Sequence, residues 1–318
     1  MRNINAVITG VGGWVPTYIL DNDEMSTIVD TSDEWIMERI GVKTRHILKP
    51  EEGTGTSFMM TRAVRQLIDK TKVDPDTIEA VICATTTPDY HFPSTASLVI
   101  GNIGLKNAFG FDMEAACAGF LYAMETAAGF IRSGRYKRLI VCGGDHMSSM
   151  TNYQDRNTCP IFGDGAACVL MEATEEDYGL MDSYLRVDGQ GYENLHMAAG
   201  GSARMPSHET VDQRLHFVYQ EGRAVFKHAV TDMSDAVATI AERNKLTKDD
   251  IAGLEFRDDG DELQQRWQYS REQAKSDILN NIRQAQNQYV AEQTALLQRH
   301  QASMQAYNEF AQREMAEP

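Results

Sequence analysis

Residues 112–120 read DMEAACAGF, a strand-like run that passes through small residues into a helical pattern. A helix that begins just after Cys117 places its unpaired N–H groups and the positive end of its dipole near that side chain. Such an environment favours the thiolate form of a cysteine and can stabilise an oxyanion on an acyl group attached to the sulfur. From this spacing alone, packing of a buried cysteine beside a small-residue turn is the more common interpretation.

The pattern on both sides of this stretch alternates short β-branched runs with amphipathic stretches up to about Leu254, which is typical of an α/β fold. Strands are predicted at Ile4–Val11, Ala80–Thr85, Phe109–Met113, Leu139–Cys142 and Ala167–Met171. Helices are predicted at Ser32–Arg39, Thr56–Lys70, Thr95–Ile103, Gly119–Ser133 and Glu221–Asn244. The last helix has an apolar stripe that predicts a core face: Val225, Ala229, Met233, Ala236, Val237 and Ile240.

Three glycine-rich segments are predicted to be turns. GVGG at residues 10–13 and GGD at 143–145 follow strands, and GDGAA at 163–167 precedes one, where the backbone must approach something closely. None of the three opens into the helix that a dinucleotide fingerprint requires, so we expect no nicotinamide site.

Length, charge and hydropathy narrow the class of protein. A chain of 318 residues fits one large α/β unit or two domains of ordinary size. The net charge of −16 argues against a nucleic-acid partner, because phosphate binding needs a basic face. No segment approaches the roughly 20 apolar residues of a membrane span, and Met1 leads directly into a strand pattern without a basic apolar leader. We therefore expect a cytoplasmic protein without a membrane partner.

The five cysteines include no C-x-x-C pair, which fits a reducing compartment and predicts no metal site. Cys83, Cys142 and Cys168 lie inside apolar strands, so core packing is predicted for all three. At most one cysteine is needed for chemistry.

Several motifs occur in the order of a known family. They are DTSDEWI (30–36), RIG (39–41), ATTT (84–87), FPS (92–94), AACAGF (115–120), SG (133–134) and IFGDGA (161–166). Together they resemble 3-oxoacyl-[acyl-carrier-protein] synthase III over residues 1–254. The resemblance implies the thiolase fold, two similar βαβαβαββ halves with helices between their sheets. We expect the first half at 1–174, a partial second half at 175–254 and a helical segment outside the family at 255–318.

The resemblance also implies a reaction, the first condensation of fatty-acid synthesis. Cys117 would take an acetyl group from acetyl-CoA, or another acyl group from its CoA thioester. It would then pass this group to the carbanion formed when malonyl-[acyl carrier protein] loses CO2, so that covalent catalysis divides the condensation into two steps. Coenzyme A is a substrate here, no cofactor is implied, and the enzyme would be a homodimer.

The same resemblance assigns residues to the substrate. Trp35 is similar to the residue that stacks on the adenine of coenzyme A, although without the family match it would be interpreted as a core residue that anchors its helix. Phe92 is similar to a residue that reaches across the dimer interface into the partner's acyl pocket. Residues implied to bind coenzyme A or substrate are Thr31, Trp35, Arg39, Arg156, Ile161, Phe162 and, in the pantetheine channel, Phe226.

The resemblance ends near Leu254. In the family this point leads into a strand ending in Val-Pro-His-Gln-Ala-Asn, and a later segment supplies Gly-Asn-Thr; neither motif is present here. The His and Asn that complete a Cys-His-Asn set therefore have no counterpart, and nothing in the sequence places His146, His196, His228 or His300 beside Cys117. We expect acyl transfer to Cys117 to survive while condensation is impaired, because the enolate would lack its donors.

The last 64 residues contain twelve Gln, and no Gly follows Gly260. Their helical periodicity is typical of a solvated helix or of a partner-binding coiled coil. A chain of this kind is alternatively a non-catalytic scaffold that dimerises with or regulates an intact synthase, with the helical segment recruiting a partner. A third interpretation is that this segment is not native to the gene.

Overall fold

A computed structural model describes residues 4–247 of the chain, which divides into two compact units at Val225 and Phe226. The first unit is built on a five-stranded mixed sheet with strand order β1-β7-β6-β4-β5. Strand β4 pairs in parallel with both β5 and β6, whereas β7 runs antiparallel to β1 and β6. The strands are β1 (Asn5–Trp14), β4 (Ala80–Ala84), β5 (Phe109–Met113), β6 (Arg138–His146) and β7 (Asp164–Thr174).

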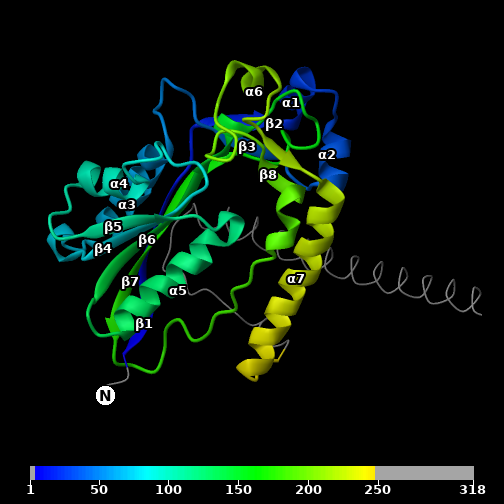
Figure 1. Ribbon diagram of the computed structural model, residues 1–318. Helices are drawn as coiled ribbons and strands as arrows, with labels where there is room; N and C mark the ends of the chain where they lie inside the picture. The colour runs from blue at the N-terminus through cyan, green and yellow to red at the C-terminus, as the bar shows by residue number, and fades with distance from the viewer. Residues whose placement is uncertain (1–3, 248–318) are drawn as a thin grey trace, which may run out of the picture. The chain divides into compact units, whose positions relative to one another are not determined.

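Helices cover both faces of this sheet, which gives three layers (Figure 1). Helices α3 (Thr56–Thr71) and α4 (Thr95–Ile103) pack on one face, and α5 (Gly119–Arg132) packs on the other. The alternation of side chains along each strand separates the two cores, because Val81 and Cys83 join the cluster under α3 while Ile82 joins the cluster under α5. The α/β prediction is therefore confirmed for this unit.

The cysteine predictions for the strands are also confirmed. Cys83, Cys142 and Cys168 face one another across β4, β6 and β7, and none of them is exposed. Their side chains pack in the core between the sheet and α3.

A smaller layer, of which the sequence predicted only the helix at Ser32–Arg39, lies beside the main sheet. Strands β2 (Tyr18–Asp21) and β3 (Thr44–Ile47) pair antiparallel, and α1 (Asn22–Ile28) and α2 (Asp33–Arg39) connect them. A separate apolar cluster holds this layer together: Leu20, Met25, Ile36, Ile47 and Cys159.

The glycines of β1 and β6 were predicted to form turns, and this prediction is wrong. Both segments lie inside strands, where Gly10, Gly12 and Gly143 allow helices to approach the sheet closely and Gly144 packs on the neighbouring strand β7. A Cβ atom on Gly12 would lie 2.2 Å from the carbonyl oxygen of Ala63 on α3, and one on Gly143 would lie 2.9 Å from the ring of Phe120 on α5. The missing side chains are therefore a packing requirement. Gly163, just before β7, does meet the expected close approach, since its Cβ would lie 3.1 Å from the carbonyl oxygen of His46.

After β7 the described residues contain few regular elements. They are the 3-10 helix η4 (Gly189–Asn194), β8 (Leu195–Met197), α6 (His208–Asp212), β9 (Val218–Gln220) and α7 (Gly222–Arg243). Helix α7 matches its predicted range to within one residue, but its apolar stripe is not core, because no residue of α7 is buried and Met233 is 63% exposed. Up to residue 247 only the short strands β8 and β9 follow β7. The prediction for 255–318 lies outside the described residues.

Within residues 4–247, none of the helices combines the length and the apolar composition that crossing a membrane would require.

The close approach of α3 to β1 predicts the effect of adding one carbon atom. We expect Gly12→Ala to destabilise the protein by about 2 kcal/mol, because the new methyl group collides with backbone that cannot move independently of α3. Thermal unfolding should show a decrease in Tm of roughly 4–8 °C.

Gly101→Ala on α4 is the matched control, since a Cβ there meets no atom within 4 Å. It should raise stability by about 0.5–1 kcal/mol, as alanine does in a helix interior. Equal Tm values for the two variants would contradict the packing explanation.

Candidate active site

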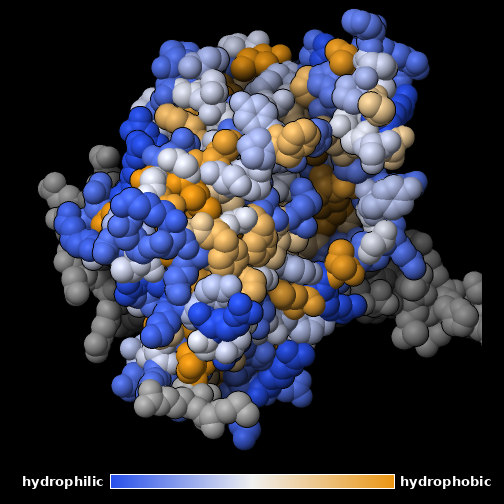
Figure 2. All heavy atoms as spheres, turned by 60° about the vertical axis from the view of Figure 1, so that its left-hand side comes forward, coloured by the Kyte–Doolittle hydropathy of each residue, from blue (hydrophilic) through white to orange (hydrophobic). Residues whose placement is uncertain are grey.

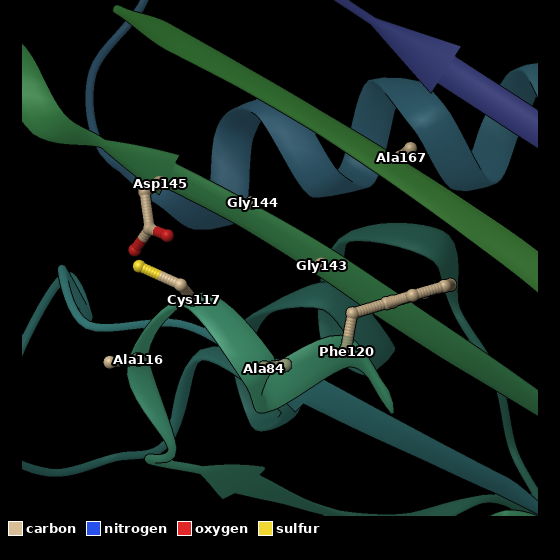
Figure 3. Close-up of a pocket in the computed structure, with 8 residues that line it drawn as sticks. All are labelled: Ala84, Ala116, Cys117, Phe120, Gly143, Gly144, Asp145 and Ala167. Atoms are coloured by element: carbon tan, nitrogen blue, oxygen red, sulfur yellow. The ribbon is translucent and has the colours of Figure 1, made fainter. Parts of the chain in front are cut away.

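Cys117 lies in a short 3-10 turn, η2 (Ala116–Ala118), that joins β5 to α5. Its side chain is exposed and faces a cavity of about 260 Å³. In Figure 3 the sulfur points toward the carboxyl group of Asp145, which projects from β6. The cavity is lined by Ala84, Ala116, Cys117, Phe120, Gly143, Gly144, Asp145 and Ala167.

The backbone before the cysteine is strained. Ala116 has a φ of 44°, in the left-handed region that costs a residue with a Cβ atom about 1–2 kcal/mol. This conformation turns the chain sharply from β5 into α5, whose first turn has no side-chain cap. The predicted arrangement of a cysteine at an uncapped helix N-terminus is therefore present.

Small residues let this turn lie against the sheet. A Cβ on Gly119 would lie 3.2 Å from the Cβ of Ala84, at the end of β4. Since β4, β5 and β6 are parallel, their carboxyl ends share one edge of the sheet. Cys117 lies at that edge, where open α/β sheets commonly bind ligands.

Asp145 was not predicted from the sequence as a site residue. Its Oδ1 accepts hydrogen bonds from the backbone N–H groups of Thr86 (2.7 Å) and Thr87 (3.1 Å), and the hydroxyl of Thr85 is 2.9 Å away. The hydroxyls of Thr86 and Thr87 also lie 3.0 Å from the same oxygen. Asp145 thus ties the ATTT motif to the end of β6, and the run of three threonines was the signal that could have found it.

A second carboxyl group lies close to the turn. Glu114 Oε1 accepts a hydrogen bond of 3.3 Å from the backbone N–H of Ala116. Partial desolvation raises the pKa of Glu114, the Ala116 hydrogen bond opposes this shift, and the negative charge of Asp145 adds to it. Glu114 therefore holds a proton to a higher pH than an ordinary glutamate.

A different part of the first unit brings together three of the predicted coenzyme-binding residues. The guanidinium carbons of Arg39 and Arg156 lie 5.2 Å and 4.7 Å from the centre of the Trp35 ring. Arg156 also forms an ion pair of 3.2 Å with Asp30, whose side chain is fully exposed. The Trp35 ring packs in part on the small apolar cluster beneath α2, so it is an anchor as well as an exposed aromatic face.

The remaining predicted residues are spread over several segments. Thr31 precedes the N-cap of α2, and its hydroxyl is buried without a hydrogen-bond partner in the described structure. Ile161 and Phe162 are half-buried in the segment that carries Arg156. Phe92 is 86% exposed in the loop before α4. Phe226 is exposed on α7 in the other unit, so its place beside the pantetheine stays a prediction.

No histidine is among the eight residues that line the cavity. His146 Nε2 lies 3.8 Å from Asp164, His196 Nδ1 lies 3.1 Å from the carbonyl oxygen of Glu193, and His228 faces Asp232 at 3.6 Å. His300 lies outside the described residues. Over residues 4–247 we also find no cluster of three or more His, Cys, Asp or Glu side chains that could hold a metal ion.

Comparison with known proteins places these features in a family. The family described as 3-Oxoacyl-[acyl-carrier-protein (ACP)] synthase III matches residues 111–189, which include Cys117, Asp145 and Arg156. The beta-ketoacyl-[acyl-carrier-protein] synthase III of Phocaeicola vulgatus is 65% identical over 251 residues, covering 79% of this chain and 75% of that protein. Synthase III 2 of Bacteroides thetaiotaomicron matches with the same identity and coverage.

Solved structures give the same result. The crystal structure of 3-oxoacyl-[acyl-carrier-protein] synthase III from Aquifex aeolicus superposes with a TM-score of 0.68 at 33% identity, covering 76% of this chain and 73% of that one. The corresponding enzyme from Pseudomonas aeruginosa gives a TM-score of 0.67 at 32% identity, covering 76% and 72%.

The exposure of Cys117 predicts selective modification. Cys83, Cys142, Cys159 and Cys168 are fully buried, and burial raises the pKa of the Cys159 thiol to about 11. Iodoacetamide should therefore add one group to the native protein at pH 8, on Cys117, and five groups after denaturation. Peptide mass spectrometry of the native protein and of Cys117→Ser checks this, and comparable native labelling of a second cysteine would contradict the structure.

Proposed function

Because this chain belongs to the 3-oxoacyl-[acyl-carrier-protein] synthase III family, the thiolase-like condensing enzymes of fatty-acid initiation, we propose that Cys117 is its acyl-accepting nucleophile. Its thiolate attacks the carbonyl carbon of acetyl-CoA, a bond forms between that carbon and Sγ, and coenzyme A leaves as the thiolate. The observation that carries this proposal is the exposed thiol at the uncapped start of α5, facing a cavity.

In the second half-reaction, malonyl-[acyl carrier protein] would lose CO2 and its carbanion would attack the acyl carbon. This step releases the Cys117 thiolate and forms acetoacetyl-[acyl carrier protein]. The developing enolate is an anion, so it needs hydrogen-bond donors or a positive charge. Apart from Cys117, the polar side chain that lines the cavity is the Asp145 carboxylate, which repels an anion.

We propose that this chain carries out acyl transfer well and condensation poorly. The match to the relatives covers 75% of their length, and the two family motifs that supply His and Asn have no counterpart in the sequence. Acyl transfer depends on the thiolate and on backbone donors at the start of α5, which the described residues provide. The two half-reactions should therefore separate.

The proposed coenzyme A site is the surface around Trp35. An adenine base would stack on the indole ring, and the guanidinium groups of Arg39 and Arg156 would bind phosphate groups. The Arg156–Asp30 ion pair is exposed, so it contributes little to stability and can exchange for a phosphate. Thr31, Ile161 and Phe162 would contact the rest of the coenzyme, and the pantetheine role of Phe226 stays a prediction from the family resemblance.

We further propose a homodimer in which Phe92 enters the partner's acyl pocket. Strand β5 is at the edge of the five-stranded sheet, where its backbone can pair with a second copy. Apolar side chains gather on the face of the molecule shown in Figure 2. The exposed apolar residues of the first unit include Tyr90, Phe92, Phe109 and Leu121.

Separation of the two half-reactions can be measured directly. Radiolabelled acetyl-CoA should label wild-type protein on Cys117, and Cys117→Ala should not be labelled. With malonyl-[acyl carrier protein] added, the rate of acetoacetyl product should be at least about 10²-fold below that of the Phocaeicola vulgatus relative, as expected for the loss of oxyanion donors. Product at the relative's rate would overturn the proposed impairment, and absence of label would favour the scaffold alternative.

Stacking on Trp35 predicts a defect that depends on the nucleotide. Trp35→Ala should raise KM for acetyl-CoA by about 5- to 150-fold, because base–aromatic stacking contributes about 1–3 kcal/mol. The thioester of acetate with N-acetylcysteamine has no nucleotide, so the same variant should acylate Cys117 from this donor at the wild-type rate. An equal loss with both donors would mean that Trp35 acts through the fold.

A further inference from the structure

We propose that Arg45 is a positioning residue that holds together the two segments of the coenzyme A site. One segment is α2 with Trp35 and Arg39, and the other is the 155–162 turn with Arg156. This inference rests on the proposed function of the Trp35 surface.

Arg45 lies on β3, and its side chain is only 3% exposed. Its three hydrogen bonds within residues 4–247 all end on uncharged oxygens. Desolvation lowers the pKa of Arg45, and electrostatic interactions with Cys159, Tyr153 and Asp21 partly oppose this shift. A guanidinium group buried in this way is unfavourable for stability compared with an apolar side chain of similar size. What distinguishes Arg45 is the geometry that its planar donors impose on three separate backbone segments.

The first connection leads to α2. Arg45 Nη1 donates to Asn22 Oδ1 at 2.6 Å, and Asn22 Nδ2 donates to Asp33 Oδ1 at 2.6 Å. Asp33 is the first residue of α2, two positions before Trp35. Both Arg45 Nη2 (3.5 Å) and Asn22 Nδ2 (3.1 Å) also donate to the carbonyl oxygen of Val42, which follows the end of α2. The pair of Arg45 and Asn22 therefore holds both ends of the helix that presents Trp35 and Arg39.

The second connection leads to the turn of Arg156. Arg45 Nε donates to the carbonyl oxygen of Pro160 at 2.7 Å. This turn is rigid in itself, because Asp155 accepts hydrogen bonds from the backbone N–H groups of Asn157 (2.9 Å) and Cys159 (3.0 Å). A turn that is rigid internally moves as one body, so its contact with Arg45 fixes where Arg156 lies.

The distance of 4.7 Å between Arg156 and the Trp35 ring depends on these two segments, which are 121 positions apart in sequence. Apolar packing also joins them, since Ile36 of α2 and Cys159 of the turn belong to the same buried cluster. Apolar contacts are non-directional, whereas the hydrogen bonds of a guanidinium fix both distance and orientation. Arg45 thus sets the spacing into which an adenine base must fit.

The test is the rate of Cys117 acylation in the full-length protein by two donors, acetyl-CoA and the N-acetylcysteamine thioester of acetate. Arg45→Met keeps the volume and removes all three hydrogen bonds. We expect KM for acetyl-CoA to rise by about 3- to 30-fold, within the range for a disrupted cation–π and phosphate contact. The maximal acylation rate and the rate with the short thioester should stay within about two-fold of wild type, because Cys117 rests on a different core.

Arg138→Met is the matched control. Arg138 Nε donates to Glu172 at 2.6 Å and Nη1 to Thr77 at 2.6 Å, at the start of β6 and away from both the cavity and the Trp35 surface. This variant should change Tm and leave the ratio of KM values for the two donors unchanged. A structural role alone for Arg45 predicts the same behaviour as Arg138→Met, and that result would overturn the inference.

A second variant covers the case in which Arg45→Met does not fold. Arg45→Lys keeps the charge but has a single nitrogen, so it cannot reach Asn22, Val42 and Pro160 together. An unchanged KM for acetyl-CoA in Arg45→Lys would overturn the inference, and a raised KM with an unchanged short-donor rate would support it. An unchanged KM for acetyl-CoA in Trp35→Ala would contradict the proposed coenzyme site itself. A raised KM in Trp35→Ala with an unchanged KM in the Arg45 variants would contradict only the positioning role of Arg45.

Discussion

The close approach of α5 to β4 and β6 is the contact on which the cavity depends. It requires glycine at 143, facing the Phe120 ring, and at 119, facing Ala84. Because α5 lies this close, the turn before it must bend within three residues, which forces Ala116 into a left-handed conformation. Packing energy from the core under α5 sustains that strain. The exposed position of Cys117 thus depends on the missing side chains of Gly143 in β6 and Gly119 in α5.

The charges around the thiol follow from a different requirement. Asp145, at the end of β6, links this strand to the turn after β4 because it accepts hydrogen bonds from successive threonines of that turn. Its negative charge raises the pKa of Glu114 further than desolvation alone would. A negative charge in the cavity wall disfavours any anion that forms beside it unless hydrogen-bond donors stabilise that anion. The same residue therefore orders the cavity and places a negative charge in its wall.

Local sequence was sufficient to predict the main sheet and its helices. The alternation of apolar residues along a strand and their helical periodicity both reflect which face of the element is buried. It failed at glycines 10–13 and 143–145, since the identity of a glycine does not tell whether a turn or a neighbouring helix requires it. It also missed β2 and β3, two four-residue strands in which polar residues interrupt the alternation. Arg45 and Asn22 have no local signature, because their partners are distant in sequence. Trp35 and Arg156 were assigned from the family resemblance, and only the fold shows that they are in contact.

The proposed coenzyme site at Trp35 and the cavity at Cys117 pack on different apolar clusters, and one short motif connects them. Trp35 rests on the small cluster of the β2–β3 layer, whereas Cys117 rests on the sheet. Asp164, at the start of β7, accepts a hydrogen bond of 2.7 Å from the backbone N–H of Leu48, just after β3, and Gly163 packs on His46. From Ile161, beside the Arg156 turn, to Ala167 on the cavity wall there are six residue steps, a span of at most about 20 Å. The IFGDGAA segment therefore connects the Arg156 turn to the cavity wall.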